Sequence, residues 1–286
     1  MLQLDLRKFT EPVGIVRMFL VLLTCICFAL VASAGIPNNA ASYWAWCMFC
    51  WTFCCLFTLL IFILELTSLK TKVPISWDDF TMAFAMLSTL MMVTVSIIYP
   101  SFFTCSSCSR EIGASVVSWL AFGLYVGEVW LLHRKPGEIS GFLSTVPGLL
   151  KILETFIACM IFTSLSPEAY KRFPGTQWCV FVYSICFICS LLIILLTISR
   201  VMPACMISFE KVVIGFNGVA VALYATAVVI WPLYMFKDNP RPVECEHCPW
   251  DNLVVITFMT VINLLVYTTD VAYSVKLVFF SQQGQG

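Results

Sequence analysis

The segment Trp46–Ser68 reads WCMFCWTFCCLFTLLIFILELTS and is predominantly apolar over more than the roughly 20 residues that a helix needs to cross a bilayer. A second segment, Trp178–Arg200, reads WCVFVYSICFICSLLIILLTISR and lies 132 positions later. The two segments share eight identities, more than an apolar composition alone gives by chance. The identical pairs are Trp46/Trp178, Cys47/Cys179, Phe49/Phe181, Cys54/Cys186, Leu59/Leu191, Leu60/Leu192, Ile61/Ile193 and Leu64/Leu196. A duplicated membrane-spanning helix is therefore the starting point.

The composition of the whole chain indicates an integral membrane protein. Of its 286 residues, 60% are hydrophobic and 11% are charged, whereas soluble proteins carry roughly 25% charged residues. Its 16 Lys and Arg balance 16 Asp and Glu, which excludes a nucleic-acid binder that neutralises phosphates. The two histidines, His133 and His247, leave little imidazole for catalysis or metal binding.

Eight segments are long and apolar enough to span a bilayer as helices. Turn and helix-breaking residues separate them, including Pro74, Pro100, Pro203 and Pro240. An even number of spans places both termini on one side. The predicted spans are Val13–Ala34, Tyr43–Leu66, Phe80–Tyr99, Ala114–Leu132, Gly148–Leu165, Trp178–Ser199, Val212–Phe236 and Leu253–Phe280.

The distribution of Lys and Arg predicts that this side is the cytoplasm. The cytoplasmic loops and helix ends then hold eleven cations and the outer side five, as the positive-inside rule requires. The inner cations are Arg7, Lys8, Arg17, Lys70, Lys72, Arg134, Lys135, Lys151, Arg200, Lys211 and Lys276; the outer ones are Arg110, Lys171, Arg172, Lys237 and Arg241. An alternative for the first span is a signal peptide cleaved after Ala32-Ser33-Ala34, but the apolar run is long for one.

The repeat extends over all four helices of each half. A shift of 134 positions aligns Gly14 with Gly148 and Arg17 with Lys151, and a shift of 142 aligns Glu128 with Asp270. A shift of 140 superposes Cys105-x-x-Cys108 on Cys245-x-x-Cys248. Each unit has four spans and so starts and ends on the same side, which makes the repeats parallel. Inverted repeats would have favoured an alternating-access transporter.

Four-helix units that open with Gly-x-x-Arg or Gly-x-x-Lys resemble MARVEL domains, and a tandem pair in a chain of this size resembles the myeloid-associated differentiation marker family. The resemblance implies an all-α integral membrane protein of eight transmembrane helices in two tandem four-helix bundles. We expect one unit over residues 9–135, a cytoplasmic linker over 136–144, a second unit over 145–281 and a short tail over 282–286. Occludin-like MARVEL proteins act as scaffolds through a cytoplasmic coiled-coil tail, and a tail this short does not support that role.

The resemblance also implies a function. It implies a non-enzymatic protein of the plasma membrane that organises ordered, cholesterol-rich membrane domains, with roles in membrane trafficking, cortical actin attachment and cell adhesion. The expected partners are membrane lipids, including cholesterol, and other membrane proteins, including a second copy of the chain, but no nucleic acid. The main alternative is a channel or small-solute transporter that uses intramembrane carboxylates, and a second is a thiol oxidoreductase.

Ionisable residues inside the spans need a partner or a function, because burying a charge at mid-bilayer is costly. Arg17 and Lys151 lie about one turn inside the cytoplasmic boundary, at a depth comparable to Glu128 and Asp270 on the last helix of each unit. We expect the pairs Arg17–Glu128 and Lys151–Asp270, with Glu154 sharing the second at i+3. The pairs either lock helices together or bind ions or protons.

The cysteines fall into several groups. Cys105, Cys108, Cys245 and Cys248 face the oxidising side, where a disulfide within each loop, a cross-loop disulfide and a zinc site are the alternatives. Cys205, in a basic cytoplasmic loop, is a candidate for S-palmitoylation or a free thiol. Most others lie within helices as packing residues.

Small residues recur at helix-packing spacing in Gly123-x-x-x-Gly127 and Gly218-x-x-x-Ala222, where they permit close approach of helices within the chain or between copies; we expect packing within the chain. The sequence contains no phosphate-binding loop, metalloprotease motif, nucleophile elbow or pair of catalytic carboxylates. It therefore predicts no catalytic, cofactor-binding or metal site.

Overall fold

The computed structural model describes residues 6–36, 41–67, 75–105, 108–134, 146–166, 170–199, 206–237, 239, 241 and 249–283. The chain divides into two compact units, residues 1–140 and 141–286. All regular structure in the described ranges is helical: a short 3-10 helix η1 (Leu6–Phe9) and eight α-helices of 19 to 35 residues. All eight are long and apolar enough to cross a membrane, so the predicted all-α class and number of spans are confirmed.

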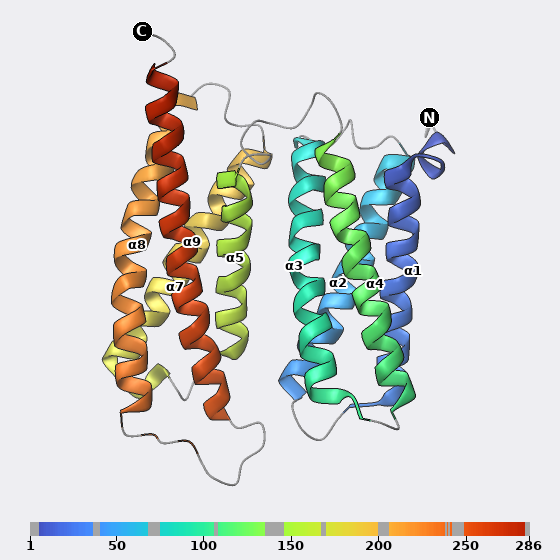
Figure 1. Cartoon of the computed structure of the whole chain (residues 1–286), viewed down its shortest axis with the longest axis horizontal. Coiled ribbons are helices and arrows are strands. Elements are labelled where there is room, and N and C mark those ends of the chain that lie inside the picture. The colour runs from blue at the N-terminus through green and yellow to red at the C-terminus, as the bar shows by residue number, and fades with distance from the viewer. Residues whose placement is uncertain are drawn as a thin grey trace. The chain divides into compact units, whose positions relative to one another are not determined.

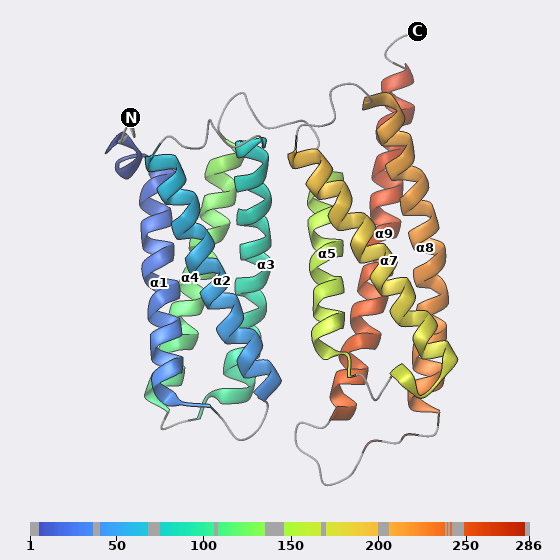
Figure 2. The same ribbon diagram turned by 180° about the vertical axis from the view of Figure 1, so that it is seen from behind.

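The first unit is a closed ring of four helices: α1 (Pro12–Ala34), α2 (Ala41–Leu66), α3 (Trp77–Phe103) and α4 (Ser109–His133). Helix α1 contacts α2 and α4, and α3 contacts the same two helices from the other side. Figures 1 and 2 show this arrangement from opposite directions. The first and last helices of the unit are therefore neighbours, and their buried side chains can meet.

The second unit repeats this order with α5 (Val146–Ser164), α7 (Pro174–Ile198), α8 (Met206–Phe236) and α9 (Pro249–Gln283). Helix α5 contacts α7 and α9, and α8 contacts the same two helices. Helix α5 thus corresponds to α1, α7 to α2, α8 to α3 and α9 to α4. In the described spans of both units, the backbone N–H and C=O groups are hydrogen-bonded within helices, as an environment without water requires.

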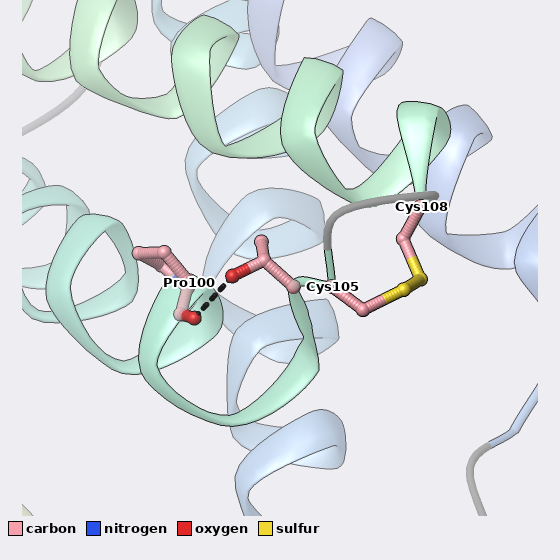
Figure 3. Close-up of a disulfide and its surroundings, with 4 residues drawn as sticks. Pro100, Cys105 and Cys108 are labelled. Carbon is pink, nitrogen blue, oxygen red and sulfur yellow. Dashed lines mark hydrogen bonds between the residues drawn. A yellow bond between two sulfur atoms is a disulfide. The ribbon is translucent and has the colours of Figure 1, made fainter.

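One predicted helix end is wrong. Pro100 was expected to end the third span, but α3 continues past it to Phe103. A proline near the last turn removes only one backbone hydrogen bond. The hydroxyl of Thr104 donates to the carbonyl oxygen of Pro100 at 2.5 Å and so satisfies one of the free carbonyls at the helix end (Figure 3). Pro232, 132 positions later, lies inside α8 in the same way.

Both units have large apolar side chains on their outer surfaces as well as in their cores. A helix that is apolar all round suits an environment of lipid. Large buried side chains include Trp51, Tyr99 and Tyr125 in the first unit and Tyr183, Tyr224, Trp231 and Tyr267 in the second. Exposed ones include Phe19, Leu22, Leu56, Trp119 and Leu120 in the first and Phe181, Leu192, Val229, Phe258 and Leu265 in the second. The ionic side chains deep in the spans, in contrast, lie inside the bundles: Arg17, Glu128, Lys151, Glu154 and Asp270 are all buried.

Candidate functional site

The ionic cluster of the first unit centres on Arg17, which lies five residues into α1 and is only 1% exposed. Its Nε atom lies 2.5 Å from Oε1 of Glu128 on α4, so the structure brings these two predicted partners together. A second carboxylate, Glu65 on α2, lies with Oε2 2.6 Å from Nη1 of Arg17. The indole of Trp77 donates to the other oxygen of Glu65 at 2.9 Å. One guanidinium thus joins three helices of the ring.

Sequence reasoning missed Glu65. The residue comes one position before the end of α2, where an acid is expected to face lipid headgroups, and its side chain is in fact 13% exposed. The signal that could have identified Glu65 is its depth in the membrane, which matches the depth of Arg17. Because α1 and α2 run in opposite directions, the last turn of α2 lies at the level of the first turns of α1, where Arg17 is.

The ionic cluster of the second unit centres on Lys151, five residues into α5 and fully buried. Its Nζ atom lies 2.8 Å from Oδ2 of Asp270 on α9 and 2.7 Å from Oε2 of Glu154, so the structure brings the three predicted residues together. Nζ also donates to Oδ1 of Asn217 on α8 at 2.5 Å. Three acceptors around one nitrogen match the three N–H donors of a charged ammonium group.

Further polar side chains surround this cluster. Asp270 accepts hydrogen bonds from Nδ2 of Asn217 at 2.8 Å and from the hydroxyl of Ser274 at 3.1 Å. Glu154 accepts one from the hydroxyl of Ser190 on α7 at 3.0 Å. Asn217 was missed from the sequence, although a carboxamide within an apolar span is itself a signal of an interhelical hydrogen bond.

The hydrogen bonds in the middle of each bundle repeat in the two units. The hydroxyl groups of Thr58 and Tyr125 lie 2.8 Å apart, and those of Ser190 and Tyr267 lie 2.9 Å apart. These residues occupy equivalent positions under shifts of 132 and 142. A second hydrogen bond is also repeated. In the first unit Nε1 of Trp51 donates to Oγ of Ser118 at 2.9 Å, and in the second the hydroxyl groups of Tyr183 and Thr260 lie 2.8 Å apart. The two units therefore share a framework of interhelical hydrogen bonds as well as helix order.

The predicted cysteine sites are only partly described. The Sγ atoms of Cys105 and Cys108 form a close pair in the connection between α3 and α4 (Figure 3). Cys245, Cys248 and Cys205 lie outside the described residues. Within the described part of the chain, no group of three or more His, Cys, Asp or Glu residues is placed to hold a metal ion.

The small residues do not pack helices together within the units, contrary to expectation. Gly123, Gly218 and Ala222 are exposed and Gly127 is half-buried. A Cβ atom added at any of the three glycines would meet nothing within 4 Å. These small residues therefore lie on the outer surfaces of the two bundles. Close approach occurs instead at Gly14, where an added Cβ would lie 1.8 Å from the backbone oxygen of Lys8.

The ionic clusters are suited to holding helices together rather than to catalysis of acyl or phosphoryl transfer. Every charged group in them is engaged by an opposite charge from another helix or the next turn. Removing one partner of such a buried pair typically costs about 3–5 kcal/mol. Each cluster therefore fixes the register of the helices that it joins.

Comparison with known proteins agrees with this architecture. Residues 8–131 and 142–273 each match the MARVEL family, a membrane-associating domain. The chain is 40% identical over 292 residues to human myeloid-associated differentiation marker, covering 96% of this chain and 90% of the relative. It is 38% identical over 293 residues to mouse myeloid-associated differentiation marker-like protein 2, covering 96% and 95%. No solved structure gives a significant match. The chain thus belongs to the MARVEL family, as a tandem pair of the domain, and within it to the myeloid-associated differentiation marker family.

Proposed function

We propose that this multi-pass membrane protein organises ordered, cholesterol-rich membrane domains and acts through them in membrane trafficking, cortical actin attachment and cell adhesion. It does so without catalysing a reaction. Its partners are membrane lipids, cholesterol among them, and other membrane proteins, including a second copy of the chain. The proposal combines family membership with the surface of the two bundles.

One observation carries the proposal: the apolar residues on the outer faces are large and numerous, whereas the charged residues of the two ionic clusters are enclosed within the bundles. In the first unit Phe19, Leu56 and Leu120, each more than half exposed, lie on three different helices. Burial of apolar surface stabilises a contact by about 25 cal/mol per Å² where water is the alternative. In a bilayer, shape and packing against lipid tails decide instead. Rigid bundles with broad outer faces suit selection among lipids better than turnover of a substrate.

The orientation forms part of the proposal. The protein lies in the plasma membrane, with both termini in the cytoplasm. The excess of cations on the side of the termini supports this orientation. The outer cysteines then face an oxidising compartment, so Cys105 and Cys108 form a disulfide, and Cys245 and Cys248 form a second. Cys205 carries a reversible palmitoyl group on the cytoplasmic side.

A channel or transporter is the alternative class. The carboxylates that it would use, Glu128 and Asp270, each contact a buried cation on a neighbouring helix. Ion pairs of this kind would have to open in every transport cycle, which favours the organiser.

The test is flotation of the full chain in ordered-membrane fractions, with and without cholesterol depletion, and solute flux into liposomes made from the same preparation. We expect flotation that depends on cholesterol and flux no greater than in empty liposomes. A Cys205→Ser variant separates the contribution of the palmitoyl group from that of the bundles. Flotation equal to that of a bulk membrane marker, or flux above the empty liposomes, would contradict the proposal.

A further inference from the structure

Two buried oxygen atoms in the second unit have no hydrogen-bond donor: Oε1 of Glu154 and Oδ1 of Asn263. Both side chains are fully buried, with 0% exposure. They lie on the adjacent helices α5 and α9, where Nδ2 of Asn263 lies 3.5 Å from the backbone oxygen of Glu154 and donates to the hydroxyl of Tyr224 at 2.7 Å. A buried oxygen without a donor is rare in proteins and calls for an unseen proton, water or cation.

The charges around Glu154 do not balance if both acids are ionised. Lys151 contributes one positive charge, and Glu154 and Asp270 would contribute two negative ones, all three fully buried. Glu154 is the ninth of the 19 residues of α5, so it lies about 12 Å along a helix about 28 Å long. An unbalanced charge near the middle of a bilayer is unfavourable, which requires one additional positive charge in the cluster.

The hydrogen bonds identify which of the two acids, Glu154 or Asp270, takes the additional positive charge. Asp270 accepts three hydrogen bonds, from Lys151, Asn217 and Ser274, and both of its oxygens are engaged, as in a carboxylate. Glu154 accepts from Lys151 and Ser190 through Oε2 alone. Lys151 has three acceptors and is therefore charged itself.

We propose that Glu154 is a proton-binding site of the second unit, with the proton held on Oε1. The hydroxyl so formed is a donor where the carboxylate had a bare oxygen, and we assign Oδ1 of Asn263, the other buried oxygen without a donor, as its acceptor, because Asn263 already contacts the backbone of Glu154. Proton binding makes the cluster neutral: one ammonium, one carboxylate and one carboxylic acid. The site is independent of the proposed organising function.

The groups that face Glu154 come from all four helices of the ring. The charged and titratable groups are Lys151 on α5, Cys186 on α7, Tyr224 on α8, and Tyr267 and Asp270 on α9. Lys151 is the single cation among them, and Asp270 neutralises it. The proton on Glu154 therefore has no competing cation among these groups.

The first unit provides an internal control. Its second acid, Glu65, has both oxygens engaged, one by Arg17 and one by Trp77, and its side chain is 13% exposed at the end of a helix. Water reaches this acid, so its excess charge is screened and no proton is required. We therefore place the proton on the deep acid of the second unit and expect Glu65 to be ionised.

The test is infrared spectroscopy of the purified full chain in lipid at neutral pH. A protonated carboxyl group has a C=O band above the amide region that shifts in D2O. We expect this band in the wild-type protein, its loss in Glu154→Gln, and its retention in the matched variant Glu65→Gln. Isotopic labelling assigns the band without any substitution: labelled glutamate shifts it and labelled aspartate does not. If Glu154→Gln fails to fold, the labelling still assigns the band to glutamate, and retention of the band in Glu65→Gln and Glu128→Gln then leaves Glu154 as its source.

Three results would overturn the proposal. The first is the absence of a shifting band in the wild-type protein, which would mean that water occupies the site. The second is a band that shifts with labelled aspartate or disappears in Glu65→Gln. The third is a band that appears only when choline replaces sodium in the buffer, because a metal cation would then hold the position of the proton.

Discussion

The two units solve the same electrostatic problem in different places. Each sets one buried cation, Arg17 or Lys151, against two acids. In the first unit the second acid comes from the end of α2, close to the membrane surface. In the second it comes from α5 itself, one turn deeper than the cation. Duplication has thus kept the number of charges and changed their depth.

The equivalent positions show how this change was made. Glu65 corresponds to Thr197, so the second unit lacks the acid near the surface, and Leu20 corresponds to Glu154, so the first lacks the deep one. Ala85 and Ala121 correspond to Asn217 and Asn263, the two carboxamides around the deep cluster. The polar residues that support Glu154 therefore occur together with it. Both units keep a buried cation that joins helices. The helix that supplies the second acid differs between them, α2 in the first unit and α5 in the second.

The largest expected effect is that of removing the cations. Lys151→Met leaves at least one carboxylate unpaired in a fully buried place, and we expect it to destabilise the second unit by about 3–5 kcal/mol. Arg17→Met should cost the first unit less, because water can reach Glu65. Hydrogen-exchange mass spectrometry distinguishes the units: peptides of α5 and α9 should lose protection in Lys151→Met, and those of α1 and α4 in Arg17→Met. Equal losses, or a larger one in the first unit, would contradict the difference in depth.

A smaller effect is expected from changing the type of cation in the first unit. Arg17 contacts its two acids from separate positions on a planar guanidinium, through Nε and Nη1, whereas a lysine at this position would present all its donors at one point. Arg17→Lys should therefore weaken one of the two contacts and cost about 1.5–3 kcal/mol, the range for a hydrogen bond to a charged group. A thermal melt of the variant measures this cost. A melting temperature equal to that of the wild type would mean that one contact suffices and that Glu65 contributes little.

The sequence predicted the charged pairs better than their surroundings, for a physical reason. Arg17 and Glu128 stand out because a charge deep in an apolar span needs a partner and because neighbouring helices of a ring can supply it. Glu65 does not stand out, since it is near a helix end where acids are ordinary. Which face of a helix is turned inward is also weakly encoded, because the helices are apolar all round. This is why Gly123 and Gly218 were expected inside and lie outside.

The hydroxyl pairs in the middle of the bundles sharpen the comparison. Tyr267→Phe removes the hydroxyl next to Ser190, which itself donates to Glu154, whereas Tyr125→Phe removes a hydroxyl that bonds to Thr58. Each should cost about 0.5–1.5 kcal/mol, with Tyr267→Phe near the upper end. Thermal melts of the two variants in one lipid mixture measure the difference. A larger loss in Tyr125→Phe would show that the hydroxyl pair, not its link to the acid, sets the cost.

The smallest effect concerns the outward glycines, which occupy unrelated helices: Gly123 on α4 and Gly218 on α8. A new methyl group meets nothing within its own unit. Alanine is favoured over glycine inside a helix by about 0.5–1 kcal/mol. We therefore expect Gly123→Ala and Gly218→Ala to leave the melting temperature unchanged or to raise it slightly. Gly14→Ala is the matched control and should lower it, because its methyl group would meet the backbone of Lys8.

A marked loss in either outward variant would mean that its helix packs closely against something beyond its own bundle. Cross-linking at two protein concentrations would then distinguish a second copy of the chain, whose contact weakens on dilution, from a contact within one chain, which does not.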